Sequence, residues 1–401
     1  MSAQLSVLLP PPLAARGTSY TCGQIVRGMA SPDFKVTVIT PRASGYPISP
    51  ANTIQVLPSW ARAVPYSWLR PFAKDKVEIE FLNHVGMLPA GGRAAYIWAD
   101  ASMRTIQELR RSGVPIFREM INGPRGAAKP ILEKAYRDFG VEPCHGISDA
   151  SIDDEDAALA AVDHVLCPNA MVAAAVLQRG VSPEKIINAS YGWDPVRLLG
   201  RKKSLEPAPG LTALFVGTLS VRKGAHLLLH HWAGSRIKGR LVLAGKMEPV
   251  IREKCAQLLA REDVIVLDYV EDVGALFRSA DVFVFPTLEE GGPQVVYEAC
   301  GCGLPVITTP MGAGRIVHNG REGFVLDAYD HVGWIGALQI MAEHLDRRHE
   351  MARSAADRAS DFHWNKVALR RRDQIVRRLS PQDSDPWVES SNAGWLGVAG
   401  E

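Results

Sequence analysis

Two glutamates, Glu290 and Glu298, lie eight positions apart in the stretch PTLEEGGPQVVYEACGCGLPV, residues 286–306. Apolar runs on both sides predict strands, so the expected order is strand, tight loop, short helix, strand. Pro293 suits the first helical position, because it has no N–H that would need a partner there. The helix would present free N–H groups and the positive end of its dipole to the loop, which favours an anion. One carboxylate in the loop and one on the helix suit a ligand that carries a phosphate and hydroxyl groups.

A second candidate for phosphate binding is the stretch FVGTLSVRKG, residues 215–224. It reads as a strand that turns at Gly217, followed by Arg222 and Lys223 at the entry to a helical stretch. A basic side chain beside the carboxyl end of a strand can neutralise phosphate oxygens. The alternative is a solvated pair of loop residues, which the nearby glutamate segment disfavours.

The glutamate segment resembles the glutamate–seven residues–glutamate signature of the retaining glycosyltransferases of family 4, which have the GT-B fold. Spacing, glycines and flanking strands agree together, and the matching residues are Pro286, Glu290, Gly291, Glu298, Ala299, Cys302, Gly303, Leu304 and Pro305. The resemblance implies that Glu298 holds the ribose hydroxyls of a nucleotide diphosphate sugar and that Glu290 contacts the donor sugar. It also implies that the donor faces the backbone of Gly291, Gly292, Pro293 and Gln294. Since glycine has no Cβ, we expect the ligand to approach Gly291 and Gly292 closely.

The basic stretch resembles the glycine–arginine–leucine … lysine–glycine motif of the same family, whose basic residues hold the donor diphosphate. Gly217 and Lys223 match this motif, whereas Thr218 stands where the family has an arginine. Arg222 can supply the missing charge. A further loop, PMGAGRI at 310–316, corresponds to one that lies at the donor site in the family, although its glycines also fit an ordinary turn.

The first half of the chain matches the family only loosely. Gly17, after the first strand, corresponds to a glycine-rich loop below the donor diphosphate. Many relatives have a histidine near the donor sugar, but the corresponding stretch REMINGP, 118–124, has none. Glu119 or Asn122 are the available substitutes. The other interpretation is that the leaving phosphate takes the acceptor proton, which requires no protein base.

Metal binding is not expected from the cysteines or from the acidic run. The six cysteines are scattered, and one C-x-C without a second pair does not predict a zinc site, so we interpret them as reduced thiols. The run Asp153-Asp154-Glu155-Asp156 contains D-x-D, which binds a metal–nucleotide complex in the other major glycosyltransferase fold. It precedes a predicted helix, so we interpret it as acidic capping of the dipole. No metal and no cofactor besides the nucleotide sugar substrate is predicted.

Composition and length predict a globular protein of two domains. The chain has 401 residues, of which 47% are hydrophobic and 22% charged, and a net charge of +2 gives no reason to expect nucleic acid as a partner. The amino-terminal stretch lacks the pattern of an export signal, and no apolar run approaches the roughly 20 residues of a membrane span. We therefore expect a cytoplasmic protein.

Strands and helices alternate through both halves of the chain, which predicts two doubly wound α/β domains facing across a cleft. The predicted strands are 5–9, 36–40, 54–57, 95–98, 115–118, 165–167 and 185–189, then 214–217, 241–244, 264–267, 282–285, 306–308 and 324–326. We expect an acceptor-side domain at 1–197, a linker at 198–210 and a nucleotide-sugar-binding domain at 211–362. The resemblance implies that a helix at 363–380 crosses back to the first domain. The polar tail, 381–401, is predicted to be disordered.

Aromatic and basic residues alternate in one stretch of the first domain, at Trp60, Arg62, Tyr66, Trp68, Arg70, Phe72, Lys74 and Lys76. Together with the basic helix that carries Arg370, Arg371, Arg372, Arg377 and Arg378, it suits peripheral contact with an anionic membrane surface. The alternatives are acceptor-side loops or plain core.

The predicted function is sugar transfer, with retention, from a nucleotide diphosphate sugar to a glycan, lipid-linked or small-molecule acceptor. The competing hypotheses are a nucleotide-sugar epimerase of GT-B fold and a catalytically inactive partner subunit.

Overall fold

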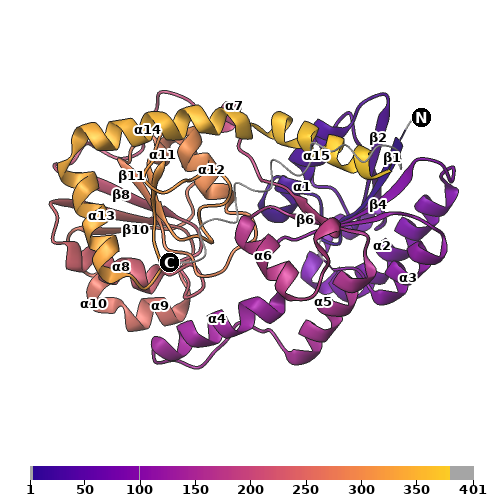
Figure 1. Cartoon of the computed structure of the whole chain (residues 1–401), viewed down its shortest axis with the longest axis horizontal. Helices are drawn as coiled ribbons and strands as arrows, with labels where there is room; N and C mark the ends of the chain where they lie inside the picture. Colours follow the sequence, from indigo (N-terminus) through magenta and orange to yellow (C-terminus); the bar gives the residue numbers. More distant parts are fainter. Residues whose placement is uncertain (1–2, 99, 380–401) are drawn as a thin grey trace.

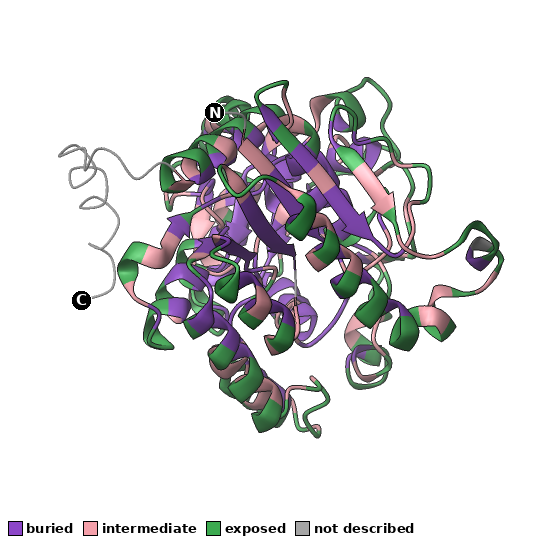
Figure 2. Cartoon of the chain, turned by 90° about the vertical axis from the view of Figure 1, so that its right-hand side faces the viewer, coloured by how far each residue is buried: buried purple, intermediate pink, exposed green. Residues whose placement is uncertain are grey.

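The computed structural model describes residues 3–98 and 100–379, which form two α/β halves side by side (Figure 1). Each half has its own parallel sheet with helices packed around it, as the alternation of strands and helices predicts. The central strands of the first half are buried, whereas the edge strand Asn52–Gln55 and the outward faces of the helices are partly or fully exposed (Figure 2). The predicted tail, 381–401, lies outside the described residues.

The first sheet has seven parallel strands in the order β3-β2-β1-β4-β5-β6-β7. They are β1 (Ala3–Leu8), β2 (Phe34–Thr40), β3 (Asn52–Gln55), β4 (Arg93–Trp98), β5 (Ile116–Glu119), β6 (His164–Cys167) and β7 (Ile186–Asn188). The helices of this half are α1 (Gly17–Met29), α2 (Tyr66–Met87), α3 (Met103–Arg111), α4 (Arg125–Asp138), α5 (Asp149–Ala161) and α6 (Ala170–Gln178), with short 3-10 turns η1 (Ser59–Ala63) and η2 (Pro183–Lys185).

The second sheet has six parallel strands in the order β10-β9-β8-β11-β12-β13. They are β8 (Leu211–Val216), β9 (Gly239–Ala244), β10 (Val264–Leu267), β11 (Val282–Phe285), β12 (Val306–Thr308) and β13 (Gly323–Val325). Its helices are α8 (Ala225–Ser235), α9 (Pro249–Lys254), α10 (Ala256–Leu259), α11 (Val273–Phe277), α12 (Gln294–Gly301), α13 (His331–Glu343) and α14 (Leu345–Ala359), which leads into η3 (Ser360–Phe362). The short helix α7 (Pro195–Leu198) stands in the connection between the halves. Every predicted strand coincides with an observed one, with ends that differ by at most a few residues.

The strand order reverses between β8 and β11, which is the position where doubly wound sheets usually bind their ligands. The loop after β8 packs directly against the loop after β11. Leu288 N–H donates to the carbonyl of Arg222 at 2.9 Å. Gly224 has a φ of +67°, and a Cβ on it would lie 2.0 Å from the carbonyl oxygen of Pro286. Only glycine therefore allows the basic loop to lie this close to the glutamate loop.

The last helix, α15 (Trp364–Leu379), crosses back from the second half and packs against α1 of the first, as predicted (Figure 1). Arg371 on this helix is buried, and its Nη1 lies 2.6 Å from Glu119 Oε2 and 2.8 Å from the hydroxyl of Tyr96. Two expectations are therefore wrong. Arg371 is not available to a membrane surface, and Glu119 cannot act in place of the absent histidine, because it is sealed in this ion pair.

Candidate active site

Lys223 and Glu290 are brought together at the mouth between β8 and β11. Lys223 Nζ forms an ion pair with Glu290 Oε1, and both side chains are largely buried. Burial, with repulsion from the neighbouring Arg222, lowers the pKa of Lys223 to about 7. Burial and Arg222 thus favour the neutral amine, whereas the carboxylate of Glu290, the partner of Lys223 in this structure, favours the cation.

Arg222 makes a different set of contacts. Its Nε lies 2.6 Å from Glu289 Oε2, its Nη2 donates to Asn122 Oδ1 at 2.9 Å, and Glu290 Oε2 is farther away, at 3.7 Å. Asn122 belongs to the first half, so Arg222 reaches across the cleft. Glu289 is not among the site residues predicted from the sequence. The one sequence feature that could have indicated it is its position next to Glu290. Asn122, a predicted substitute for the histidine, is a hydrogen-bond partner of Arg222 in this structure.

Glu298 lies on α12 and is buried where the two halves meet. Its Oε1 accepts from Gln294 Nε2 at 2.8 Å and lies 3.6 Å from Arg197 Nη1. Burial raises the pKa of Glu298, while Arg197 and Gln294 act in the opposite direction. Gln294 in turn accepts from Thr21 Oγ1 of α1 at 2.9 Å, and the guanidinium of Arg197 lies 5.0 Å from the ring centroid of Tyr20. Arg197, on α7, was not predicted, because nothing in its sequence context marks it.

The glycines of the glutamate loop are not open to a ligand in this structure. A Cβ on Gly291 would lie 1.7 Å from the carbonyl oxygen of Ile121, and one on Gly292 would lie 2.3 Å from the ring of Tyr191. Parts of the first half occupy the space that we expected a donor to use. Helix α12 begins at Gln294, with Pro293 as its N-cap, so the predicted helix start is one residue early.

The other predicted donor glycines are less enclosed. Gly17 opens α1 with a φ of +56°, and no atom lies within 4 Å of the place where its Cβ would be. Gly217 follows β8 with a φ of +146°, and the nearest atoms to its Cβ position belong to the ring of Phe215 at 3.8 Å. Both positions therefore leave room beside the backbone.

The loop at 310–316 joins the halves and also borders the glutamate segment, because a Cβ on Gly314 would lie 3.2 Å from Pro293 Cγ. Its assignment to the donor site stays a prediction. Asn169 Nδ2 donates to the carbonyl of Met311 at 2.5 Å. Arg315 Nε donates to the carbonyl of Ala189 at 2.7 Å, and its Nη2 donates to Asn188 Oδ1 at 2.7 Å. These contacts hold the loop to the ends of β6 and β7.

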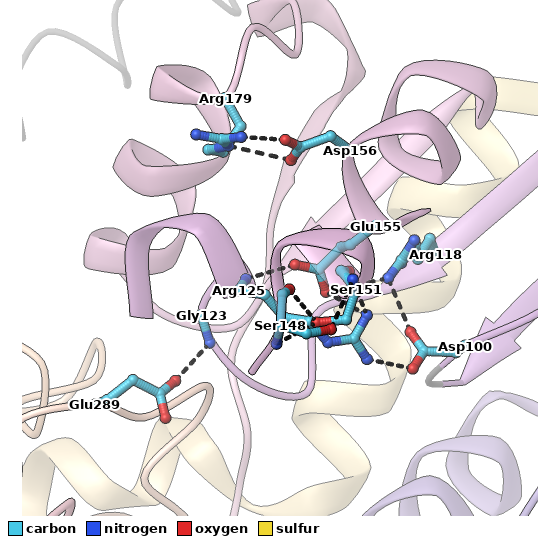
Figure 3. A network of polar contacts seen from close by, with 10 residues as sticks. All are labelled: Asp100, Arg118, Gly123, Arg125, Ser148, Ser151, Glu155, Asp156, Arg179 and Glu289. Atoms are coloured by element: carbon cyan, nitrogen blue, oxygen red, sulfur yellow. Dashed lines mark hydrogen bonds and ion pairs between the residues drawn. The ribbon is translucent and has the colours of Figure 1, made fainter. Parts of the chain in front are cut away.

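The acidic run is not a helix cap, as we had interpreted it. Ser148 caps α5 in a capping box with Ser151, so the run begins more than one turn inside the helix. Glu155 is buried and its Oε1 lies 3.4 Å from Arg118 Nη2, while Asp156 pairs with Arg179 (Figure 3). The run therefore serves ion pairs within the first half.

These ion pairs anchor the loop that joins β5 to α4. Arg118 Nη2 lies 3.2 Å from Asp100 Oδ1, and Arg125 on α4 pairs with the same aspartate. The backbone N–H of Arg125 donates to Glu155 Oε2 at 2.5 Å. Figure 3 shows Glu289 of the other half reaching Gly123 beside this cluster, with Gly123 N–H donating to Glu289 Oε1 at 2.9 Å.

Part of this sequence is similar to known glycosyltransferases. Residues 210–344 match the family model described as glycosyl transferases group 1. A D-inositol 3-phosphate glycosyltransferase of Paenarthrobacter aurescens (strain TC1) is 36% identical over 98 residues, which are 24% of this chain and 24% of that protein. One of the same name from Streptomyces bingchenggensis (strain BCW-1) is 27% identical over 389 residues, which are 88% of this chain and 83% of that protein. The chain spans about a quarter of the length of the first of these relatives.

Solved structures share the arrangement of both halves. Sucrose-phosphate synthase from Thermosynechococcus elongatus has a TM-score of 0.70 at 18% identity, covering 94% of this chain and 99% of the synthase. HepE of Anabaena, in complex with UDP and glucose, has a TM-score of 0.63 at 14% identity, covering 94% and 100%. The chain has the GT-B fold. The predicted fold class is confirmed.

Two cavities adjoin the GT-B cleft. One, of about 290 Å³, lies between the halves, and its walls include Asn122, Arg125, Tyr136, His145, Arg222 and Glu289. The other, of about 520 Å³, opens beside the connection between the halves, and its walls include Arg197, Arg201, Lys202, Glu271, Asp272 and Arg278. The walls of the second cavity carry more basic than acidic side chains, and one of them is Arg197 of the Arg197–Glu298 pair.

The described ranges, 3–98 and 100–379, contain neither a candidate metal site nor a candidate membrane-spanning helix. Within them no three or more His, Cys, Asp or Glu side chains are grouped so that they could hold a metal ion. No helix of those ranges is both long and apolar enough to cross a bilayer. All six cysteines lie in the described ranges, where they are free thiols.

Proposed function

We propose that this protein is a glycosyltransferase of the family 4 type, which moves a sugar from a nucleotide diphosphate sugar to an acceptor with retention at the anomeric carbon. The observation that carries the proposal is the presence of two carboxylate–cation pairs, Glu290 with Lys223 and Glu298 with Arg197, at the mouth of the second sheet. The similarity to glycosyl transferases group 1 supports the same reaction class. UDP, which HepE binds, is the first nucleotide to test.

In this proposal the donor replaces side-chain partners that the site now provides for itself. The diphosphate takes the place of Glu290 beside Lys223, and the ribose hydroxyls take the place of Gln294 and Arg197 beside Glu298. Lys223 then stabilises the negative charge that grows on the diphosphate as the glycosidic bond breaks, which is the main catalytic effect. The acceptor hydroxyl attacks from the face that the phosphate leaves, and the phosphate takes its proton. The sealed position of Glu119 supports a mechanism without a first-domain base, and no metal is proposed.

The proposed acceptor is a glycan or a lipid-linked or small-molecule alcohol. Because curated relatives are named D-inositol 3-phosphate glycosyltransferase, D-inositol 3-phosphate is the first small acceptor to test. A lipid-linked acceptor is supported by three exposed aromatic side chains, Trp60, Trp68 and Phe72, at the start of α2 and just before it. We propose that this surface makes peripheral contact with the cytoplasmic face of a membrane.

A panel of nucleotide sugars, screened by thermal shift and followed by product analysis, tests the proposal. A bound donor stabilises the folded state alone, so the melting temperature should rise with one nucleotide sugar or a few. That donor should then release its nucleoside diphosphate only when an acceptor is present. Conversion of the donor to an isomeric nucleotide sugar without an acceptor would identify an epimerase instead. No shift with any nucleotide sugar or free nucleotide would contradict the proposal.

A further inference from the structure

Three consecutive residues of the loop between β5 and α4 are held by the second half of the molecule. Gly291 packs against the carbonyl of Ile121, Arg222 donates to Asn122, and Glu289 accepts from the N–H of Gly123. Each contact comes from a residue at the mouth of the second sheet. The second half therefore holds this loop beside the proposed reaction site, where the two halves contact each other.

Glu289 connects the contacts on both sides of the cleft. It is 3% exposed, and its two carboxylate oxygens are divided between Arg222 Nε at 2.6 Å and Gly123 N–H at 2.9 Å. Arg222 Nε also donates to the backbone carbonyl of Glu289 at 3.2 Å. A buried carboxylate is stable only with such partners, and one of the two belongs to the other half. Separation of the halves would leave Glu289 with an unmet hydrogen bond.

The first half offers a rigid point of attachment. Immediately after Gly123, helix α4 begins at Arg125, whose N–H and guanidinium are held by Glu155 and Asp100 (Figure 3). The contacts of Gly123 with the second half thus lie directly beside residues that hydrogen bonds and ion pairs hold within the first half.

The far end of α4 also touches the second half. The ring of Phe139, which follows α4, lies 4.6 Å from the ring of His226 on α8. Lys134 Nζ lies 4.5 Å from the ring centroid of Tyr329. Helix α4 is thus held at both ends, and along the bottom of Figure 1 it extends from the first half to a position beneath the second half.

We propose that Glu289 and Arg222 form a clamp that holds the two halves closed by gripping Asn122 and Gly123. Glu289 is a positioning residue in this proposal, because it acts through Arg222 and the loop and not on the donor. The clamp also commits Arg222 to Glu289, which leaves Lys223 as the cation for the diphosphate. Only the consequence for turnover rests on the proposed glycosyl transfer; the effect on closure stands without it.

The test measures the distance between the halves directly. Two exposed positions, Met87 on α2 and Val332 on α13, are changed to cysteine in a Cys144→Ser background and labelled for single-molecule energy transfer. Glu289→Ala should shift most molecules to lower transfer efficiency, which means an open cleft. Glu289→Gln keeps an oxygen for Gly123 N–H but not the charge for Arg222, so its shift should be intermediate. The matched control, Glu253→Ala on an exposed surface of α9, should leave the efficiency unchanged.

Ligand measurements separate a clamp from a donor contact. For Glu289→Gln, the clamp predicts a dissociation constant for UDP within about threefold of the wild-type value, together with a turnover at least tenfold lower. An unchanged energy-transfer distribution in both Glu289 variants would overturn the proposal, whether or not UDP affinity falls. If circular dichroism shows that Glu289→Ala does not fold, Glu289→Gln and Asn122→Ala replace it. An unchanged energy-transfer distribution in both of these variants would then overturn the proposal. If no donor is ever found, the distance measurement still decides whether the clamp exists.

Discussion

At the scale of single residues, the structure separates the roles of two neighbouring bases. Lys223 is paired with Glu290, whereas Arg222 is committed to Glu289 and Asn122. If Lys223 stabilises the leaving diphosphate, Lys223→Ala should lower kcat by roughly 10²–10³-fold, the usual cost of losing one charge-stabilising group. Arg222→Ala should lower it less, because its effect comes through closure. Steady-state kinetics with the best donor gives the ranking, and a larger loss for Arg222→Ala would reverse the two roles.

The sequence pointed to both partners of the Lys223–Glu290 pair, but to only one partner of the Arg222–Glu289 and Glu298–Arg197 pairs. Glu290, Glu298 and Lys223 were predicted because loops at strand ends carry recognisable spacing. Glu289 and Arg197 were not, because their partners lie in other elements, and such contacts depend on how the halves dock. The way in which the two halves dock also explains why the backbone of Ile121, and not the expected ligand, lies against Gly291 in this structure. A missing Cβ indicates a close approach, but the sequence does not say whether a ligand or the backbone of Ile121 makes it.

At the scale of elements, two buried histidines of helix α8 should make the free energy of unfolding depend on pH. His226 and His231 are both buried in it, and burial lowers the pKa of each to about 4. Each folded-state pKa lies below the unfolded value of about 6.5. As the pH falls from 6.5 to 4, the unfolded chain takes up protons that the folded chain does not, so the free energy of unfolding falls. Relative to neutral pH, each histidine should lower the free energy of unfolding by about 2–3 kcal/mol at pH 4.

Urea unfolding at pH 7.5 and pH 4.5 tests this acid dependence. His226→Phe keeps a ring against Phe139 and removes the titrating group, so the difference between the two pH values should shrink. His349→Asn, at an exposed position of α14, is the control and should behave as the wild type. Equal pH dependence in His226→Phe and the wild type would show that this histidine does not contribute.

The start of α2 provides a second prediction at this scale. Trp68 and Phe72 are 74% and 73% exposed, next to the exposed bases Arg70, Lys74 and Lys76. Each base near an anionic surface contributes about 1 kcal/mol, so the wild type should float with anionic vesicles at low salt. The double variant Trp68→Ser, Phe72→Ser should float less, whereas Val332→Ser on the other half should not differ from the wild type. Absence of the wild type from the vesicle fraction would contradict the membrane proposal.

The strands could be predicted from the sequence more completely than the contacts between side chains. Short apolar runs bounded by glycine, proline or charged residues located every strand, because parallel strands are buried on both faces. The acidic run from Asp153 to Asp156 was misinterpreted for a local reason. Ser148 and Ser151 form the capping box one turn earlier, and the run then supplies ion pairs that only the tertiary structure reveals.

At the scale of the whole molecule, the proposed chemistry should not need a divalent metal. The charges offered to a diphosphate come from Lys223 and the start of α12. Activity after dialysis against EDTA should therefore equal the activity before it. Activity that is lost with the chelator and restored by Mg²⁺ or Mn²⁺ would contradict this part of the mechanism.

The central claim is that the cleft of this GT-B molecule binds a nucleotide diphosphate sugar through Glu298 on α12. Calorimetric titration of the donor's nucleoside diphosphate into the wild type and Glu298→Ala tests it most directly. Loss of a hydrogen bond to a charged group should cost about 1.5–3 kcal/mol, which is roughly a 10- to 150-fold weaker affinity, in a variant that still melts cooperatively. The same affinity in both proteins would remove Glu298 from the site and contradict the account.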